Sequence, residues 1–417
     1  MKITILTVGS RGDVQPYIAL ARGLCRAGHQ VTLATLEGFG PSVLAEGLAF
    51  HPLRGQFLEL MQTPEGQAVL AGKGGRMSLL RKVMPMYRLM LDDELEAARE
   101  AELIIYHPKA LGGPSLAEYL GVPSILALPL PLYSPTADWP SPIVPLDSLG
   151  PFNRVSHRML VWLAVAPVRG TLNQWRKQSL ELGPAGNELR SGPGGQALLR
   201  LYGYSPTVLP SPPDWDARSV ATGYWFLDHE PTWQPPADLE VFLQAGPPPV
   251  YVGFGSMTSQ DAAAKTQLVV AALERAGQRG VLASGWGGLA KRELPASIYQ
   301  LEAAPHDWLF PRMAAVVHHG GAGTTAAGLR AGRPTVICPF FGDQPFWGKR
   351  VAALGAGPAP LAQRRLTIEN LTAAISAAVS DPAMANAAAR VGAAIRAEDG
   401  IARAVELIEA EVAMTTP

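Results

Sequence analysis

The chain has 417 residues, 47% of them hydrophobic, and its 35 Lys and Arg residues balance 35 Asp and Glu residues. At roughly 150 residues per domain this length predicts two or three domains with sizeable cores, which excludes a single small module and a disordered chain. Because the formal net charge is zero, no long-range field is available to hold a phosphate polymer, and we expect no nucleic-acid partner.

The first forty residues follow the order strand, glycine loop, helix and strand. The β-branched run 2–8 precedes the glycine loop 9–13, a helical apolar pattern follows, and 30–36 (QVTLATL) is again typical of a strand. This order is the β-α-β start of a parallel sheet with a right-handed crossover. Further elements of the first half are expected as strands near 48–53, 103–107 and 123–130 and as helices over 91–101, 114–120 and much of 153–180.

Prolines concentrate in 229–249 (HEPTWQPPADLEVFLQAGPPP), which predicts a linker between two domains, because proline fits neither a central strand nor a helix interior. From Val250 the opening pattern returns, so the second half repeats the architecture of the first. Its expected elements are strands within 249–257, 279–286, 299–303, 314–319 and 334–340 and helices over 262–276 and 325–331. The fold class is therefore α/β, with two Rossmann-like parallel-sheet domains, and ligands are expected at the carboxyl ends of the strands in the cleft between them.

Cysteine content and the apolar runs predict a soluble, cytoplasmic protein. Cys25 and Cys338 are too few for a disulfide framework or a Cys-based zinc site, and we expect both as small buried thiols. The apolar start is too short for a signal-peptide core, and the run 159–168 is too short to span a bilayer.

The clearest motif is 316–325 (VVHHGGAGTT), a strand that stops at glycines and opens a helix. Glycines allow close backbone approach, and the free N–H groups of a helix start favour an anion such as a phosphate. Thr324 or Thr325 is expected to cap that helix or to bind a phosphate oxygen. A plain packing turn remains the alternative.

Neighbouring residues of a strand point to opposite faces, so one of His318 and His319 should be buried and the other should face the loop. Adjacent histidines do not converge on one ion, which argues against a metal site. We expect His319, next to the glycines, to donate a hydrogen bond to a phosphate.

The loop 9–13 (GSRGD) carries a carboxylate where the first helix begins. Asp13 is either a helix N-cap or a catalytic base at the strand end, with its pKa raised by desolvation. Position alone does not separate these two roles.

Two further loops follow strands in the second half. In 339–345 (PFFGDQP), Asp343 and Gln344 supply the acceptors and donors needed to bind vicinal sugar hydroxyls, with an Asx turn as the alternative. In 253–256 (GFGS), Ser256 and the loop amides are placed to reach a second phosphate, and a plain turn is an equal alternative.

Together these motifs resemble the UDP-glycosyltransferases of family 1, most closely their sterol 3-β-glucosyltransferase-like branch. The resemblance is carried by HHGGAGTT at 318–325, PFFGDQPFWG at 339–348, GSRGDVQP at 9–16 and TGYWFLD at 222–228, and it covers nearly the whole chain.

The resemblance implies a GT-B fold with four parts. These are an acceptor-binding domain at 1–228, the linker at 229–249, a nucleotide-sugar-binding domain at 250–395 and, within 396–417, a last helix that crosses back to the first domain.

The resemblance also implies roles for individual residues. His319 matches the family histidine at the donor diphosphate, and Asp343 with Gln344 matches the pair that holds the donor sugar. Many relatives carry a catalytic His after the glycine of the first loop; here Asp13 follows Gly12, as in the sterol and glycopeptide branches, which makes Asp13 the expected base. The expected donor-binding residues are Ser10, Arg11, Gly12, Gly255, Ser256, Trp286, His306, His319, Gly320, Gly321, Ala322, Gly323, Thr324, Thr325, Asp343 and Gln344.

The implied reaction is a metal-independent, inverting single displacement that needs no cofactor besides the UDP-sugar donor. Asp13 deprotonates an acceptor hydroxyl, which attacks the anomeric carbon from the face opposite the UDP, and His319 stabilises the leaving diphosphate. The expected donor is UDP-glucose, and the product is a β-glycoside of a hydrophobic alcohol such as a sterol, triterpenoid, flavonoid or polyketide.

The segment 73–91 mixes Met and Leu with basic residues, and Pro85 is expected to split any helix there. It suits a weak peripheral membrane contact, with an ordinary amphipathic helix pair over the core as the alternative. We expect a monomer or a dimer.

Two other functions remain open at this point. Glu37 follows the second strand at the spacing of a ribose-binding acid in nicotinamide-dependent oxidoreductases, although 9–12 does not match G-x-G-x-x-G. The second open function is that of a protein with the same fold that binds a nucleotide sugar or a lipid without catalysis.

Overall fold

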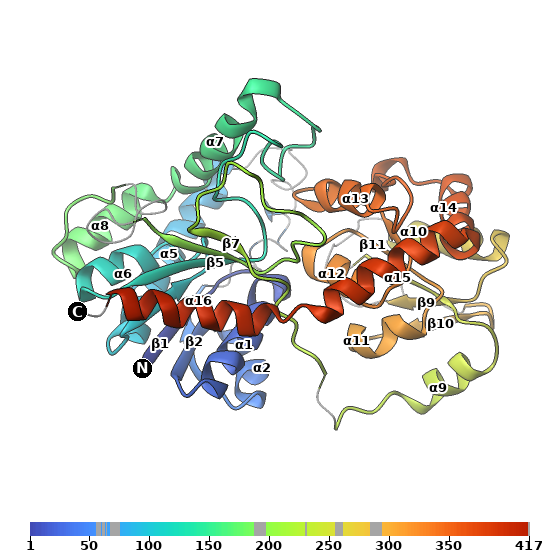
Figure 1. The fold of residues 1–417 in the computed structure, drawn as a ribbon, viewed down its shortest axis with the longest axis horizontal. Helices are drawn as coiled ribbons and strands as arrows, with labels where there is room; N and C mark the ends of the chain where they lie inside the picture. Colours follow the sequence, from blue (N-terminus) through green and yellow to red (C-terminus); the bar gives the residue numbers. More distant parts are fainter. Residues whose placement is uncertain are drawn as a thin grey trace.

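The computed structural model describes residues 1–55, 60, 63, 65–66, 76–186, 197–229, 232–254, 262–283 and 294–415. Within these residues the chain forms two parallel sheets, one in each half, with helices packed around them (Figure 1). The strand orders are β3-β2-β1-β4-β5-β6-β7 in the N-terminal sheet and β10-β9-β8-β11-β12 in the C-terminal sheet. The predicted α/β class with two parallel sheets is confirmed.

The N-terminal sheet is centred on β1, which pairs with β2 on one side and β4 on the other. Its strands are β1 Lys2–Leu6, β2 Gln30–Leu36, β3 Ala49–Leu53, β4 Leu103–Tyr106, β5 Ser124–Leu128, β6 Leu199–Tyr202 and β7 Ser219–Ala221. The first five coincide with predicted strands, whereas no strand was predicted over β6 or β7. They are short, and the pairing of β6 with β5 rather than local sequence places them in the sheet.

The helices of this half are α1 Arg11–Arg26, α2 Gly40–Ala45, α5 Arg76–Ala98, α6 Gly113–Leu120, α7 Asn153–Val165 and α8 Arg169–Ser179, with short 3-10 turns η1 Glu37–Phe39 and η2 Gly150–Phe152. The prediction that Pro85 splits the helix is wrong, because α5 continues through it. Burial of Tyr87, Met90 and Leu91 in the core offsets the lost hydrogen bond.

The C-terminal sheet repeats this plan around β8. Its strands are β8 Val250–Gly253, β9 Gly280–Ala283, β10 Ile298–Leu301, β11 Ala315–His318 and β12 Thr335–Ile337, and its helices are α10 Ala262–Arg275, α11 His306–Leu309, α12 Ala322–Arg330, α13 Gln344–Ala353, α14 Ile368–Ser380 and α15 Pro382–Ala397, with 3-10 turns η5 Phe310–Arg312 and η6 Gln363–Arg365. The predicted strands of this half are confirmed, with shorter bounds.

The proline-rich segment 229–249 contains the helix α9 Ala237–Gln244, which the sequence analysis did not predict. Its prolines all lie outside the helix, and one of them, Pro236, is at the N-cap, where a missing N–H group costs nothing. Leu239 is fully buried with Val281 and Val316 of the C-terminal sheet, and this contact holds the helix in place.

The last helix, α16 Gly400–Thr415, packs against α1 of the N-terminal half (Figure 1). Ile401 and Val405 lie over Gly23, where an added Cβ would come within 2.3 Å of the Ile401 side chain. Glu411 pairs with Arg218 at 2.5 Å. The helix after α15 thus ties the C-terminal half to the first one. Cys25, at the end of α1, is exposed, so the expectation that both cysteines are buried is wrong for this one.

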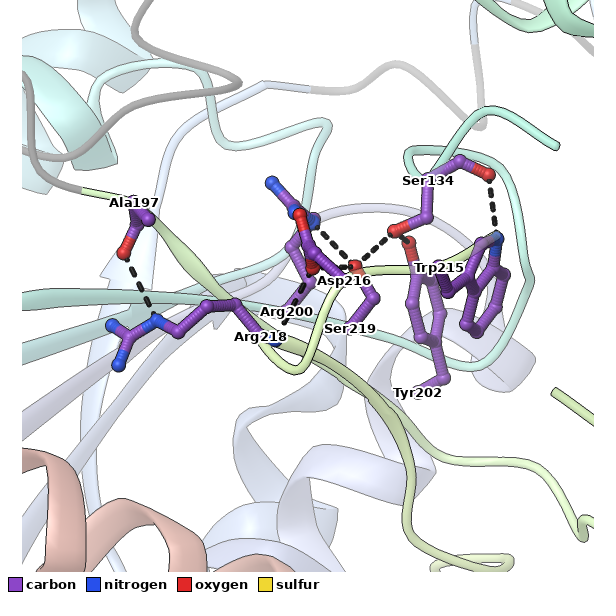
Figure 2. A network of polar contacts seen from close by, with 8 residues as sticks. All are labelled: Ser134, Ala197, Arg200, Tyr202, Trp215, Asp216, Arg218 and Ser219. Carbon is purple, nitrogen blue, oxygen red and sulfur yellow. Dashed lines mark hydrogen bonds and ion pairs between the residues drawn. The ribbon is translucent and has the colours of Figure 1, made fainter. Parts of the chain in front are cut away.

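A polar network fixes the loop that follows β5 against the β6–β7 connection (Figure 2). The Tyr202 hydroxyl donates to Ser134 Oγ at 2.6 Å, and Ser134 Oγ lies 2.7 Å from Ser219 Oγ. Arg200 and Asp216 complete it through Ser219 and an ion pair of 2.6 Å. This network gives the loop leading into α7 a rigid base.

The two halves also contact each other through side chains next to the loops of interest. Tyr204 packs edge-on against Trp347 of α13, with ring centroids 6.3 Å apart. The Arg350 guanidinium donates to the Val208 carbonyl at 2.8 Å. None of the described helices is both long and apolar enough to cross a membrane.

Candidate functional site

Loops at the carboxyl ends of the strands of both sheets meet at one place. The loop before α1 follows β1, residues 107–112 follow β4 beside it, and α12 follows β11. The charges of Asp13 and Lys109 act on the carboxyl group of Asp343, and that of Arg11 acts on His306. Because these interactions cross between the halves, residues predicted separately in the two loops belong to one site.

Asp13 lies in the first turn of α1, where its carboxylate closes a capping box. Its Oδ2 accepts hydrogen bonds from the main-chain N–H of Ser10 at 2.8 Å and from the Ser10 hydroxyl at 3.0 Å. Ser10 is therefore the cap residue, and the alternative that Asp13 itself is the N-cap is wrong. Gly9 makes room for this carboxylate, because its φ is +144° and a Cβ there would lie 2.3 Å from Asp13 Oδ2.

Two cationic or hydrogen-bonding groups from the segment after β4 surround the Asp13 carboxylate. Lys109 Nζ lies 2.9 Å from Oδ2, and His107 Nε2 lies 3.4 Å from Oδ1. Burial alone would raise the pKa of Asp13, but Lys109 and His107 together outweigh it and hold that pKa well below its ordinary value. The expectation of a pKa raised by desolvation is wrong for this reason, and the carboxylate is ionised at neutral pH.

His107 is oriented by its own backbone. The main-chain N–H of Lys109 donates to His107 Nδ1 at 3.1 Å, which leaves the proton of a neutral ring on Nε2, facing Asp13. Burial lowers the pKa of His107, so the ring is neutral at neutral pH. Its other neighbour is Tyr17, whose ring meets it edge-on at 5.8 Å.

The two histidines at the end of β11 differ as the strand alternation predicts. His318 is fully buried, and its Nδ1 accepts the main-chain N–H of Gly320 at 2.9 Å. His319 is half-buried, and burial lowers its pKa to about 4. Among the described residues, Nδ1 of His319 has no hydrogen-bond partner. Nε2 of the fully buried His318 also lacks a partner among the described residues, so His319 is the partly exposed one of two neutral rings with an unsatisfied nitrogen.

The loop after β11 requires its glycines. Gly320 has φ +91°, and a Cβ there would lie 2.6 Å from the Ile337 side chain. At Gly321 a Cβ would lie 2.6 Å from His319 Nε2. Helix α12 starts at Ala322 without a side-chain cap, so the N–H groups of its first turn remain available to an anion.

The two threonines of this helix have different surroundings. Thr325 is buried, and its hydroxyl donates to the Gly321 carbonyl at 2.9 Å, so this hydroxyl already has a partner within its own loop. Thr324 is half-buried and Gly323 is exposed, one and two residues closer to the helix start.

His306 begins α11 and stacks on Phe310, with ring centroids 4.3 Å apart and planes 15° apart. Burial, with the nearby Arg11 charge as a smaller contribution, lowers the pKa of His306 to about 4. The neutral ring therefore belongs to an aromatic stack beside the site.

Asp343 and Gln344 end the loop after β12 and have unlike roles. Asp343 Oδ2 accepts a hydrogen bond from Trp347 Nε1 at 2.8 Å. Burial raises the pKa of Asp343 to about 6, with the Asp13 charge adding to the rise and Lys109 opposing it. Gln344 is buried, and its Oε1 accepts the main-chain N–H of Phe340 at 2.7 Å, so this oxygen holds the loop instead of standing free for a sugar.

Three predicted residues, Gly255, Ser256 and Trp286, lie outside the described residues. Sequence reasoning missed His107 and Lys109. The signal was present, since the strand LIIYH at 103–107 ends in a histidine and β4 neighbours β1, but only the strand order puts this strand end beside Asp13. In the part of the chain that the structure describes, no three His, Cys, Asp or Glu side chains gather in a way that would hold a metal ion.

Comparison with known proteins identifies the family. Residues 3–136 match the glycosyltransferase family 28 N-terminal domain, and residues 287–410 match the C-terminal domain of erythromycin biosynthesis protein CIII-like proteins. A sterol 3-beta-glucosyltransferase of Arabidopsis thaliana is 37% identical over 97% of this chain, which covers 67% of that relative. The chain therefore belongs to the same glycosyltransferase family as this relative.

The chain spans only part of the length of two other curated relatives. A second Arabidopsis thaliana sterol 3-beta-glucosyltransferase is 38% identical, and the chain spans 65% of its length. One from Aspergillus clavatus is 39% identical over 98% of this chain, which spans only 29% of that relative.

Solved glycosyltransferase structures share the GT-B fold. The glycosyltransferase of kitacinnamycin superposes with a TM-score of 0.71 at 23% identity, and each chain is covered to 98%. The Streptomyces sp. SF2575 enzyme SsfS6, complexed with thymidine diphosphate, gives 0.62 at 22% identity over 98% of this chain and 99% of its own. The predicted GT-B fold is confirmed.

Proposed function

We propose that this chain transfers glucose from UDP-glucose to a hydroxyl group of a hydrophobic, sterol-like acceptor, with inversion at the anomeric carbon and without a metal ion. The observation that carries the proposal is the arrangement of Asp13 and Lys109 within electrostatic reach of Asp343, across the junction of the two halves. The names of the relatives support the acceptor class, and the nucleotide in the SsfS6 structure supports a nucleotide-sugar donor.

The C-terminal half is suited to hold the donor. The diphosphate would lie at the uncapped start of α12, where main-chain N–H groups and the helix dipole favour negative charge. His319 would donate from its unpartnered Nδ1, in a neutral tautomer at neutral pH. Asp343 would accept hydroxyl groups of the sugar, and Thr324 and the backbone of Gly323 would complete the phosphate contacts.

The N-terminal half supplies the base. Asp13 would take the proton of the acceptor hydroxyl while the oxygen forms its bond to the anomeric carbon and the bond to the diphosphate breaks. Because the pKa of Asp13 is low, the carboxylate is ionised but weakly basic, so proton transfer accompanies bond formation instead of preceding it. The Nε2–H of His107 faces Asp13 Oδ1 and keeps the carboxylate oriented.

Charge that develops on the leaving diphosphate would be stabilised by His319, the first-turn amides of α12 and Arg11. Arg11 is placed for this role, since its charge already acts on the neighbouring His306. A hydroxyl held at Asp13 would attack from the face opposite the diphosphate, so an α-linked donor would give a β-glycoside.

The test is the variant Asp13→Asn, assayed for UDP release with UDP-glucose and a sterol acceptor. We expect turnover to fall by roughly 10²- to 10⁴-fold, the typical contribution of a general base, with UDP affinity retained. Asp138→Asn, at an exposed carboxylate of the same half, is the matched control and should keep full activity.

Full turnover in Asp13→Asn, or an α-glycoside product by NMR, would contradict the proposal. UDP binding without any release of UDP from UDP-glucose would favour a silent binding protein. Membership of the glycosyltransferase family argues against the oxidoreductase alternative, which also predicts NAD binding that titration would detect.

A further inference from the structure

Helix α7 has its polar side turned inward and its apolar side turned outward. Its buried residues are Asn153, Ser156 and His157, while five large apolar side chains of 152–163 point to solvent. They are Phe152 (66% exposed), Val155 (51%), Met159 (52%), Trp162 (60%) and Leu163 (48%). We call these five side chains the α7 face. The arrangement is the reverse of an ordinary surface helix.

The buried polar residues are all hydrogen-bonded, so the orientation of α7 is fixed by specific contacts. Asn153 Nδ2 donates to the Ala137 carbonyl at 2.8 Å, and Ser156 Oγ accepts the main-chain N–H of Ser141 at 2.8 Å. His157 Nε2 lies 3.2 Å from the Trp139 carbonyl. Because rotation of the helix would bury the apolar side chains only by breaking these bonds, the exposed face is a stable property of the fold.

The apolar positions form one continuous stripe. Residues 152, 155, 159 and 162 are spaced by three and four, which places them above one another on a helix. Arg158 lies between Val155 and Trp162 on the same side and is exposed. A stripe of this size on an exposed helix marks a site that a partner covers.

The charge around α7 indicates which partner fits. Residues 148–180 contain five Lys and Arg and no Asp or Glu, in a chain whose net charge is zero. Two of the five are already paired with carboxylates, Arg154 with Asp214 at 2.5 Å and Arg176 with Glu118 at 2.8 Å. None of the ion pairs found among the described residues involves Arg158, Arg169 or Lys177. The apolar side chains of the α7 face thus lie beside one cation of the same helix without a described carboxylate partner, Arg158, and Arg169 and Lys177 follow on α8.

We propose that the α7 face docks on an anionic lipid surface, with the helix lying in the plane of the interface. The five apolar side chains would enter the boundary between headgroups and acyl chains, with Arg158 at headgroup level. A second copy of this chain fits less well, because a symmetric interface would bring the Arg158 side chains of the two copies onto the same face without carboxylate partners.

This surface differs from the membrane contact expected at 73–91. In the described part of that segment, Leu79, Tyr87 and Met90 are buried in the core, and Lys82 pairs with Glu65. The alternative of an amphipathic helix over the core therefore holds for α5, and the apolar side chains needed for a membrane contact are found on α7 instead. The inference does not depend on the identity of the acceptor or on the proposed function.

The test measures binding of the full chain to vesicles of phosphatidylcholine, with and without phosphatidylserine, by co-sedimentation. We expect binding to vesicles that contain phosphatidylserine and weak binding to phosphatidylcholine alone. The double variant Met159→Glu with Trp162→Glu should lower the partition onto anionic vesicles by at least about tenfold, since it places charge in the apolar layer. Arg158→Gln should weaken only the binding that depends on phosphatidylserine.

The matched control is Leu44→Glu with Val241→Glu, which places the same charges at exposed apolar helix positions away from α7. It should bind vesicles as the native chain does. Sugar transfer to a water-soluble acceptor and the unfolding temperature should be the same in all variants, because the changed side chains contact solvent.

Three results would overturn the inference. The first is that the native chain does not bind vesicles, and the second is that the control variant loses as much binding as the double variant. The third is that the native chain forms a concentration-dependent dimer and the double variant Met159→Glu with Trp162→Glu stays monomeric. Vesicle binding is measured without substrates, so its failure is separate from a failure of the proposed transferase activity.

Discussion

The buried carboxylate of Asp343 is predicted to lower the folding stability of the chain when it is ionised, and this prediction can be tested directly. Burial raises the pKa of this carboxyl group from 3.8 to about 6. An acid whose pKa is raised on folding opposes folding once it is ionised, so the penalty is fully present above about pH 6 and disappears as the pH falls below the unfolded value. The variant Asp343→Asn removes the charge and keeps an oxygen that accepts the Trp347 hydrogen bond.

The size of the effect follows from the two pKa values. A shift of about 2.2 units at about 1.4 kcal/mol per unit gives about 3 kcal/mol of stabilisation for Asp343→Asn near pH 7.5. Near pH 4.5 the same relation leaves about 1 kcal/mol, because the folded carboxyl group is then protonated. The gain should therefore shrink by about two thirds across this range.

The assay is calorimetric unfolding at several pH values. The unfolding transition of the C-terminal half is identified by adding UDP, which should raise its temperature because ligand binding stabilises the part of the chain that binds the ligand. Asp147→Asn is the control, since its side chain is 85% exposed and its removal should leave the unfolding temperature nearly unchanged. Sugar transfer should fall in Asp343→Asn while stability rises.

A loss of stability in Asp343→Asn at neutral pH would refute this reasoning, as would a gain that does not change with pH. The first result would mean that hydrogen bonds to the ionised carboxylate outweigh its burial. The second would mean that the stabilisation has a source other than the charge.

Three further predictions concern the loops. When UDP binds near pH 5, the native chain should take up protons and His319→Ala should take up fewer, because a bound diphosphate raises the pKa of His319 from about 4. Titration calorimetry in buffers of different ionisation enthalpy measures the number of protons taken up. Gly9→Ala should lower turnover more than UDP affinity, since a Cβ there meets the Asp13 carboxylate at 2.3 Å; steady-state kinetics and UDP titration compare the two. Lys109→Met should move the acid limb of kcat/KM to higher pH, because Lys109 lowers the pKa of both Asp13 and Asp343, whereas Lys109→Arg should restore the native profile.

The fold was predictable because its signals are local. The strands β1, β2 and β4 are runs of β-branched and aliphatic residues followed by loops, and their order identifies a parallel sheet. The weakest predictions fell on β6, β7 and α9, whose sequences carry no strong pattern. Tertiary contacts place them instead: β6 pairs with β5, and Leu239 of α9 is buried in the C-terminal core.

The site was predictable only in part. The glycine positions and His319 follow from a strand that ends at HHGG, and the structure keeps them at the start of α12. Thr325 and Gln344 were predicted as ligand contacts because of their residue types. Both use their polar atoms to hold their own loops, a choice that residue type does not reveal.

The sequence by itself determined which short segments carry chemistry, since a glycine loop at a strand end depends on a few adjacent residues. The tertiary structure alone decided the state of the carboxylates. Asp13 is ionised because the segment after β4 brings His107 and Lys109 against it, and the pKa of Asp343 is raised to about 6 because burial withdraws the carboxylate from water. Charge interactions act through space between segments far apart in the chain, so they are fixed only when the two halves pack together.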